Sequence, residues 1–242
     1  MSESSRAKSD LPRRFYKTAS SARSDTGWRI ELDGRPVRTP DKTELSLPSE
    51  ALASLVVLEW ESQAENIDPA TMPLTRLSNV AIDRTPETRE ALADEVAKYT
   101  ETDLVCHLAA NPVELRERQE AGWRPLRDWA GKSLNIMLVP VEGVIASPQP
   151  AASILAARDH AMSLDDFRLT GLAWATGLFG SAILALAVEQ GKVSAEDAFE
   201  RSRIDEAWQI EQWGEDEEAR TATENRRRDA RALGQLFTTL PR

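Results

Sequence analysis

The sequence has few of the side chains that form disulfides and zinc centres. Its 242 residues include one cysteine, Cys106, and two histidines, His107 and His160. A single thiol excludes a disulfide framework, and three such residues are too few for a structural zinc site of four cysteine or histidine ligands. We therefore expect no metal site, and a chain that works in a reducing compartment.

Basic side chains are outnumbered by acidic ones. Lysine and arginine total 30 against 40 aspartates and glutamates, which gives a net charge of −10 and an isoelectric point near 4.9. Such a balance repels phosphate backbones, so we expect no nucleic-acid partner. Residues 1–40 carry nine basic and five acidic side chains, whereas residues 196–218 carry two arginines and ten carboxylates. The acidic surplus is therefore concentrated in one segment near the C-terminal end.

The longest stretch without charge runs for 20 residues, from Leu169 to Val188. A helix of that length can cross a bilayer. Gly171, Gly177 and Gly180 interrupt the run, however, which favours a buried pair of helices flanking Gly177, where small residues let neighbours approach closely. We therefore expect no stable membrane insertion.

The first residues of the chain do not resemble a targeting signal. They contain no apolar core of the kind found in secretory signals, and Glu3 and Asp10 argue against an acid-poor transit peptide. We expect residues 1–12 to form a disordered tail and the protein to be cytoplasmic.

The first third of the chain predicts a small antiparallel sheet with a covering helix. Apolar and polar residues alternate over Trp28–Leu32, Asp33-Gly34 can form a tight turn, and an extended pattern resumes over Arg35–Thr39. Ser49 can cap a helix over residues 50–63. Further strands are expected over Phe15–Thr18 and Thr43–Leu47.

Beyond this unit the pattern is helical. Prolines within Asn66–Ser78 predict extended or turn backbone and a domain junction there. We therefore expect an α+β fold, with an N-terminal domain over 13–78 and a helical C-terminal bundle over 79–242. Helices are predicted at about 86–99, 112–130 and 150–162, beside Gly177, and after the capping serines Ser163 and Ser194, with an extended stretch over 135–144.

Motifs for catalysis are absent or incomplete. Gly131-Lys132-Ser133 resembles the end of a phosphate-binding loop, but Leu126 stands where that motif requires a glycine. Cys106-His107 cannot form a nucleophile and base pair, because adjacent side chains point in different directions. A hydrolase that uses paired carboxylates is a further alternative. On one helix, however, Asp205 and Asp216 would lie about 16 Å apart, too far to flank one bond.

The acidic segment is the most informative part of the sequence. On one helix, Phe199, Glu206, Ile210 and Trp213 form an apolar stripe, and Asp205, Gln209, Gln212 and Asp216 form a second face with Trp208 at its edge. A carboxylate on the apolar side must be paired, protonated or reserved for a docking partner. Trp208 among polar residues has the character of an interface anchor. The alternative is an acidic surface helix whose two tryptophans pack against neighbouring helices.

Several separated stretches together form an ordered pattern that covers about Arg14 to Glu218. They are Arg14-Phe15-Tyr16-Lys17, Leu32 to Pro40, Glu59-Trp60 with Gln63, Met72-Pro73-Leu74-Thr75 with Asp83, Thr102-Asp103-Leu104, Gln119 with Trp123 and Pro125, and Asp205 to Gln209 leading to Trp213-Gly214-Glu215-Asp216. In these stretches the sequence resembles the assembly chaperones of the ATP synthase catalytic head, the Atp-twelve family.

The resemblance implies a two-domain chaperone without enzymatic activity or cofactor. Its partner would be the unassembled alpha subunit, whose assembly surface it would shield until the beta subunit takes over, and it would be a monomer when free. An acidic position that is functionally sensitive in the family corresponds to Asp205 or Glu206. An acidic adaptor with an unrelated partner is the second possibility. The predicted partner-binding residues are Asp205, Glu206, Trp208, Gln209, Gln212, Trp213, Glu215 and Asp216.

Overall fold

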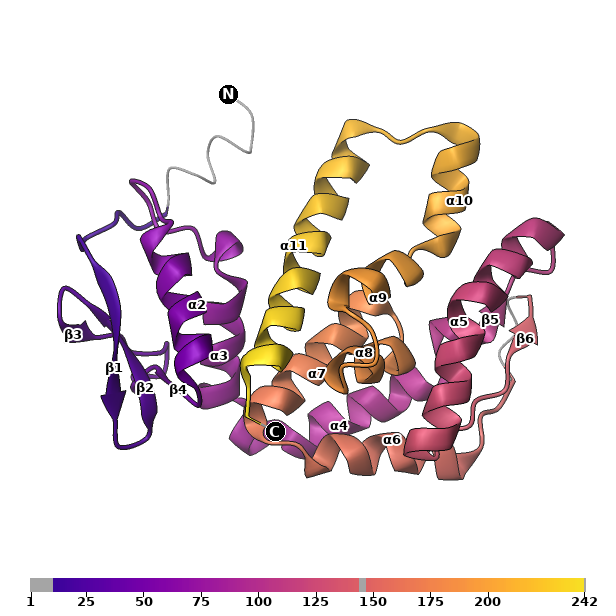
Figure 1. The fold of residues 1–242 in the computed structure, drawn as a ribbon, viewed down its shortest axis with the longest axis horizontal. Helices are drawn as coiled ribbons and strands as arrows, with labels where there is room; N and C mark the ends of the chain where they lie inside the picture. The colour runs from indigo at the N-terminus through magenta and orange to yellow at the C-terminus, as the bar shows by residue number, and fades with distance from the viewer. Residues whose placement is uncertain (1–10, 144–146, 242) are drawn as a thin grey trace. The chain divides into compact units, whose positions relative to one another are not determined.

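The computed structural model describes residues 11–143 and 147–241, which fall into two compact units (Figure 1). One unit extends to Pro86 and takes in the residues from Thr239 onward, and the other comprises Glu87–Thr238. A small antiparallel sheet with its helix precedes a largely helical region, so the predicted α+β class is confirmed. Of the tail predicted over residues 1–12, the first ten residues lie outside the described part.

The sheet of the first unit is built around β2, which pairs antiparallel with the three other strands. Asp33 and Gly34 both have positive φ, at 49° and 75°. This is the backbone that a two-residue turn requires, and it confirms the predicted hairpin. The strands are β1 (Ala19–Ser24), β2 (Gly27–Leu32), β3 (Arg35–Pro36) and β4 (Ser46–Leu47).

The strand predicted over Phe15–Thr18 is wrong, because the first strand begins at Ala19. The carboxylate of Asp33 accepts hydrogen bonds from the backbone N–H groups of Lys17, at 3.0 Å, and Thr18, at 2.9 Å. These donors therefore bond a side chain of the hairpin turn rather than a neighbouring strand. Only Ser46–Leu47 of the predicted strand over Thr43–Leu47 is a regular strand.

Helix α2 (Glu50–Glu61) packs on the sheet as expected. The Oγ of Ser49 accepts a hydrogen bond from the N–H of Leu52 at 3.1 Å and so caps the helix. Leu52, Ala53 and Val56 are fully buried on one side of α2, and Ile30, Leu45 and Leu47 are fully buried in and beside the strands. These side chains form the core of the first unit.

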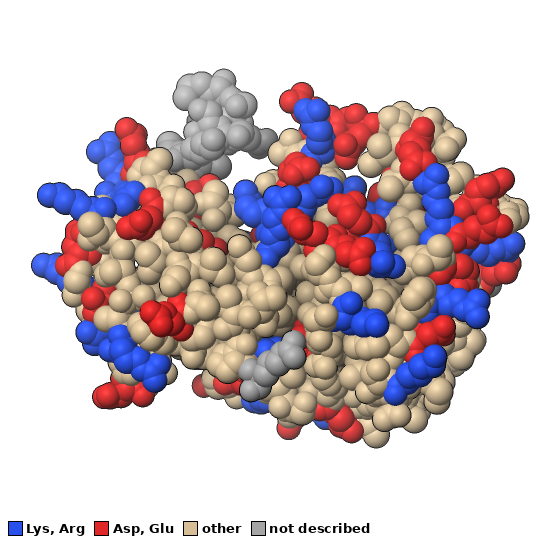
Figure 2. All heavy atoms as spheres, in the orientation of Figure 1, with Lys and Arg blue, Asp and Glu red and all other residues tan. Residues whose placement is uncertain are grey.

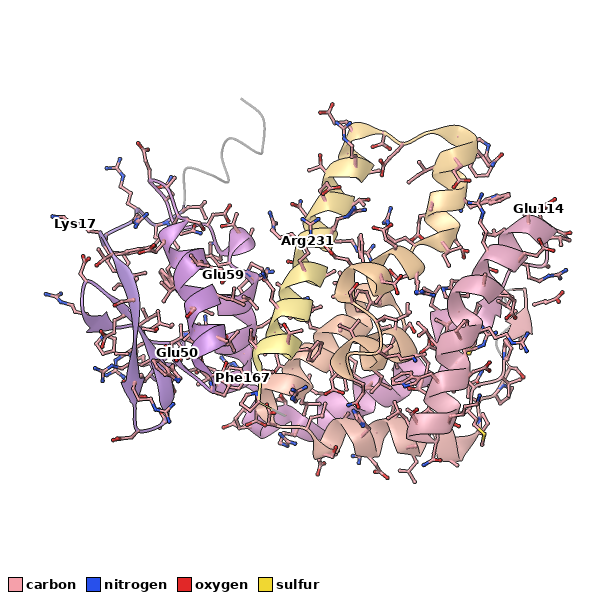
Figure 3. The ribbon with its side chains drawn as sticks, in the orientation of Figure 1. Lys17, Glu50, Glu59, Glu114, Phe167 and Arg231 are labelled. Atoms are coloured by element: carbon pink, nitrogen blue, oxygen red, sulfur yellow. The ribbon has the colours of Figure 1, made fainter. Side chains whose placement is uncertain are left out.

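The backbone from Pro73 onward is helical, which corrects the extended stretch predicted through Ser78. After the short 3-10 helix η1 (Pro69–Thr71), helix α3 spans Pro73–Asp83, with proline in its first turn, where a missing N–H leaves no hydrogen bond broken. Glu59 of α2 lies beside the start of α3 (Figure 3) and accepts hydrogen bonds there from the N–H groups of Leu74 and Thr75, at 2.7 and 2.8 Å. A carboxylate from one helix thus satisfies the first donors of the next.

The remaining elements are mainly helices, and strands β5 and β6 among them pair in parallel. They are α4 (Thr85–Glu101), η2 (Leu104–Cys106), β5 (His107–Leu108), α5 (Val113–Leu134), β6 (Val141–Glu142), α6 (Ala151–Ser163), α7 (Asp166–Phe179), α8 (Ala182–Glu189), α9 (Ala195–Arg201), α10 (Ile204–Trp213) and α11 (Glu217–Thr239).

The charge-free run forms two buried helices, α7 and α8, as expected, but they divide at Gly180 rather than at Gly177. Gly180 has a φ of +64°, which ends α7, and the Oγ of Ser181 accepts the N–H of Leu184 at 3.0 Å, which begins α8. Every residue of α8 is buried. Within residues 11–143 and 147–241, no helix has both the length and the apolar character of a membrane span.

The two predicted capping serines differ in outcome. The Oγ of Ser194 accepts the N–H of Asp197 at 3.0 Å and caps α9, which confirms the prediction. Ser163 instead ends α6, and Asp165 caps α7 by accepting the N–H of Arg168 at 3.0 Å. Helices α10 and α11 follow, and Figure 1 shows α10 and the first part of α11 projecting from the second unit and joined at their tips.

Candidate partner-binding site

The acidic segment is not one helix, which corrects the prediction of a continuous stripe from Phe199 to Trp213. Helix α9 ends before Ser202, whose hydroxyl donates to the carbonyl of Phe199 at 2.7 Å, and α10 ends before Gly214, which has a φ of +83°. Phe199 is fully buried, whereas Trp213 is 79% exposed. Asp216 lies beyond the end of α10 and does not share a helical face with Asp205.

One side of α10 is fastened to α5 through Asp205. The Nε2 of Gln119 donates to the Oδ1 of Asp205 at 2.6 Å. Gln119 is buried, and its Oε1 accepts the N–H of Ala109 at 2.7 Å, so the orientation of its amide is fixed. Burial raises the pKa of Asp205, the hydrogen bond from Gln119 opposes that change, and the charge of Glu206 adds to it. Asp205 therefore has a structural partner within the chain.

The same side of α10 carries a second fastening, through Arg118 of α5. The guanidinium of Arg118 lies 4.7 Å from the centre of the Trp208 ring and 2.7 Å from the Oε1 of Glu211. The hydrogen bond from Arg118 lowers the pKa of Glu211. Trp208 is half-buried, and Arg118 lies over its ring. The Trp208 side chain therefore takes part in the contact between α5 and α10.

The opposite side of α10 lines an open groove of about 430 Å³. Glu206, Ile210 and Trp213 of α10 border it, which confirms that these three residues share one side of the helix. Glu206 is exposed, so it needs no buried counterion there. The far wall of the groove includes Ala219, Ala222 and Arg226 of α11.

The other predicted residues lie around this groove. Gln209 also borders it, although as the fourth residue after Asp205 on the same helix it lies close to the face of Asp205. Gln212 is exposed outside the groove lining. Glu215 and Asp216 border the groove where the chain turns, and the Oδ1 of Asp216 accepts the N–H of Ala219 at 2.8 Å and so caps the first turn of α11.

The sequence analysis identified neither Arg118 of α5, which contacts one side of α10, nor the α11 residues that line the groove on its other side. Arg118 belongs to another segment, so no local pattern could connect it to Trp208. The α11 residues carried a usable signal, because Ala219, Ala222 and Arg226 are spaced three and four residues apart and so lie on one side of a helix.

The remaining candidate groups show no reactive arrangement. Cys106 is buried, and burial, followed by the nearby charge of Asp103, raises the pKa of its thiol to about 12. The thiol is therefore protonated at neutral pH and is a poor nucleophile. In the part of the chain that the structure describes, no three histidine, cysteine, aspartate or glutamate side chains are placed to hold a metal ion.

The family model for the ATP12 chaperone protein matches residues 13–131. The crystal structure of Atp12 from Paracoccus denitrificans is 40% identical, with a TM-score of 0.87 over 95% of this chain and 99% of that one. The Atu1473 protein of Agrobacterium tumefaciens has 39% sequence identity to this chain, and its crystal structure matches with a TM-score of 0.89 over 96% of this chain and 87% of that one. The mitochondrial protein atp12 of Schizosaccharomyces pombe is 26% identical over 232 residues, which cover 89% of this chain and 80% of that protein.

Proposed function

Because the chain belongs to the ATP12 chaperone family, we propose that it holds the unassembled alpha subunit of the ATP synthase catalytic head until the beta subunit replaces it. The chain is an ATP synthase assembly chaperone rather than an enzyme. A subunit that waits for its partner exposes apolar surface and is prone to aggregate. A chaperone that covers this surface until the partner subunit displaces it would prevent the aggregation.

The observation that carries the proposal is the free side of α10. Trp213 is 79% exposed beside Ile210, and the acidic side chains of Glu206 and Glu215 border the same groove. A large exposed aromatic side chain with a polar rim is typical of a protein interface. We name this surface, formed by Glu206, Ile210, Trp213, Glu215 and Asp216, the docking face.

The predicted partner-binding residues then have two roles. Glu206 and Trp213 contact the client, whereas Asp205 and Trp208 hold α10 against α5 through Gln119 and Arg118. Gln209 borders the groove, and Gln212 lies outside its lining. Of the two acidic candidates for the sensitive position, Glu206 is therefore the contact residue and Asp205 the positioning residue. The bacterial relatives support the cytoplasm as the place of action.

The test is capture of purified alpha subunit by the wild-type protein and by the Glu206→Lys variant. Glu206 is exposed, so the substitution leaves the fold intact, and we expect capture to weaken about tenfold as an attractive charge becomes repulsive. A matched control is Glu101→Lys, which makes the same charge change at an exposed position on α4, outside the groove. Its capture should equal that of the wild type.

Two results would contradict the proposal. If the wild-type protein neither binds alpha subunit nor keeps it soluble, the client is a different protein, as an acidic adaptor would require. If Glu206→Lys captures as well as the wild type, the client binds elsewhere on the chain. Circular dichroism of both variants verifies that each remains folded.

A further inference from the structure

We propose that the groove between α10 and α11 receives a client segment in which a large apolar side chain directly neighbours a lysine or arginine. This inference rests on the proposed function and specifies the chemistry of the client surface. Its geometric basis is the difference between the two sides of α10. One side is engaged by α5 through Asp205, Trp208 and Glu211, and the other borders an open groove.

The size and lining of the groove favour side chains over a whole helix. A cavity of about 150 Å³ holds a benzene ring, so 430 Å³ has room for two or three large side chains. Ile210, Ala219 and Ala222 supply apolar lining, and Trp213 borders the groove with most of its side chain in solvent. An aliphatic or aromatic side chain that entered here would cover the Trp213 ring and gain its burial energy.

The acidic side chains around the groove favour a cationic residue next to that apolar side chain of the client. Among the described residues, the side chains of Glu206 and Glu215 form no hydrogen bond or ion pair. Figure 2 shows acidic side chains next to an uncharged patch at the projecting tips of α10 and α11. A cationic side chain on the client would therefore meet carboxylates that have no partner of their own.

The two arginines that border the groove contact other groups rather than these acids. Arg226 donates to the carbonyl of Leu178 at 2.7 Å, and the guanidinium of Arg203 lies 5.6 Å from the centre of the Phe199 ring. Neither arginine forms an ion pair within the part of the chain that the structure describes. The lining holds three carboxylates, Glu206, Glu215 and Asp216, against these two arginines, so its charge stays net negative and disfavours an acidic segment.

Photocrosslinking tests this assignment. Trp213 is replaced by p-benzoylphenylalanine, a photoreactive aromatic residue, and the full chain is irradiated with purified alpha subunit. The control places the same residue at Leu155, which is 56% exposed on α6. We expect crosslinks from position 213 only, and mass spectrometry should map them to an alpha-subunit segment that joins an apolar residue to a lysine or arginine.

Affinity measurements provide the second readout. Trp213→Ala should weaken alpha-subunit binding tenfold or more, chiefly through faster dissociation, whereas Trp213→Phe should retain most of the affinity because it keeps an aromatic ring. Because Trp213 is exposed, neither variant disturbs the core.

The outcomes separate this inference from the proposed function. If the wild type captures alpha subunit while position 213 gives no crosslink and Trp213→Ala binds normally, only the groove assignment is overturned. Crosslinks to an acidic segment, or to a second copy of this chain, overturn it as well. If the wild type captures no alpha subunit, the proposed function fails and the inference fails with it.

Discussion

The carboxylate of Glu189 shows how one buried residue connects three helices. It lies 3.1 Å from the Nε2 of His160 on α6 and 2.9 Å from the Nη1 of Arg168 on α7, while Glu189 itself ends α8. Burial alone would raise the pKa of Glu189, but the hydrogen bonds from His160 and Gln190, together with the charges of His160 and Arg168, hold it below the usual value for a glutamate. The folded state therefore favours the ionised carboxylate.

We expect Glu189→Gln to lower the free energy of unfolding by about 2 kcal/mol at pH 7, because buried Arg168 loses its ion pair with the Glu189 carboxylate at 2.9 Å. A depressed pKa adds stability above the unfolded-state pKa, and this contribution is lost as the pH falls through the folded-state pKa. The difference between wild type and variant should therefore shrink below about pH 4. Urea unfolding at several pH values measures it, and a difference that does not change with pH would refute the assignment.

At the scale of one element, α10 has no buried residue and depends on α5 for its position. Ile204 at its start packs so closely against Gly122 that a Cβ there would lie 2.6 Å from the Ile204 Cδ1. Gln119 and Arg118 continue the contact along the helix. A helix of ten residues is marginal in water by itself, so these contacts decide whether the docking face is ordered.

Substituting both Arg118 and Gln119 by alanine should therefore loosen α10 selectively. We expect amide hydrogen exchange to rise over residues 204–213 and to stay unchanged in α7 and α8, whose residues are largely buried. Alpha-subunit capture should weaken although no docking-face residue is altered. Arg124→Ala, at an exposed position on α5, serves as the control. Uniformly faster exchange in all helices would show that the two residues support the whole unit instead.

Elements also show what local sequence could and could not predict. Asp33-Gly34 specifies a turn through its own backbone, so the hairpin was predictable. Strand β1 was missed because Ala19–Ser24 is mostly small and polar, and it becomes a strand through pairing with β2. The grouping of Glu206, Ile210 and Trp213 follows from helical spacing. The bond between Gln119 and Asp205 joins residues 86 positions apart, which periodicity within one segment does not reveal.

For the whole molecule, the net charge of −10 raises the question of whether overall or local charge draws the client in. Residues 196–218 hold ten of the 40 carboxylates, so the surplus is local. Charges beyond about 10 Å are screened at 0.1 M salt, which makes the nearby acids the effective ones. Charge of this kind acts mainly on the rate of encounter.

The association rate constant for alpha subunit should therefore fall about tenfold or more between low and moderate salt, while dissociation changes little. Glu206→Lys and Glu101→Lys raise the net charge by the same amount, but only the first alters the docking face. Stopped-flow binding should show a flatter salt dependence for Glu206→Lys and a wild-type dependence for Glu101→Lys. Equal flattening in both variants would mean that the overall charge, and not the docking face, attracts the client.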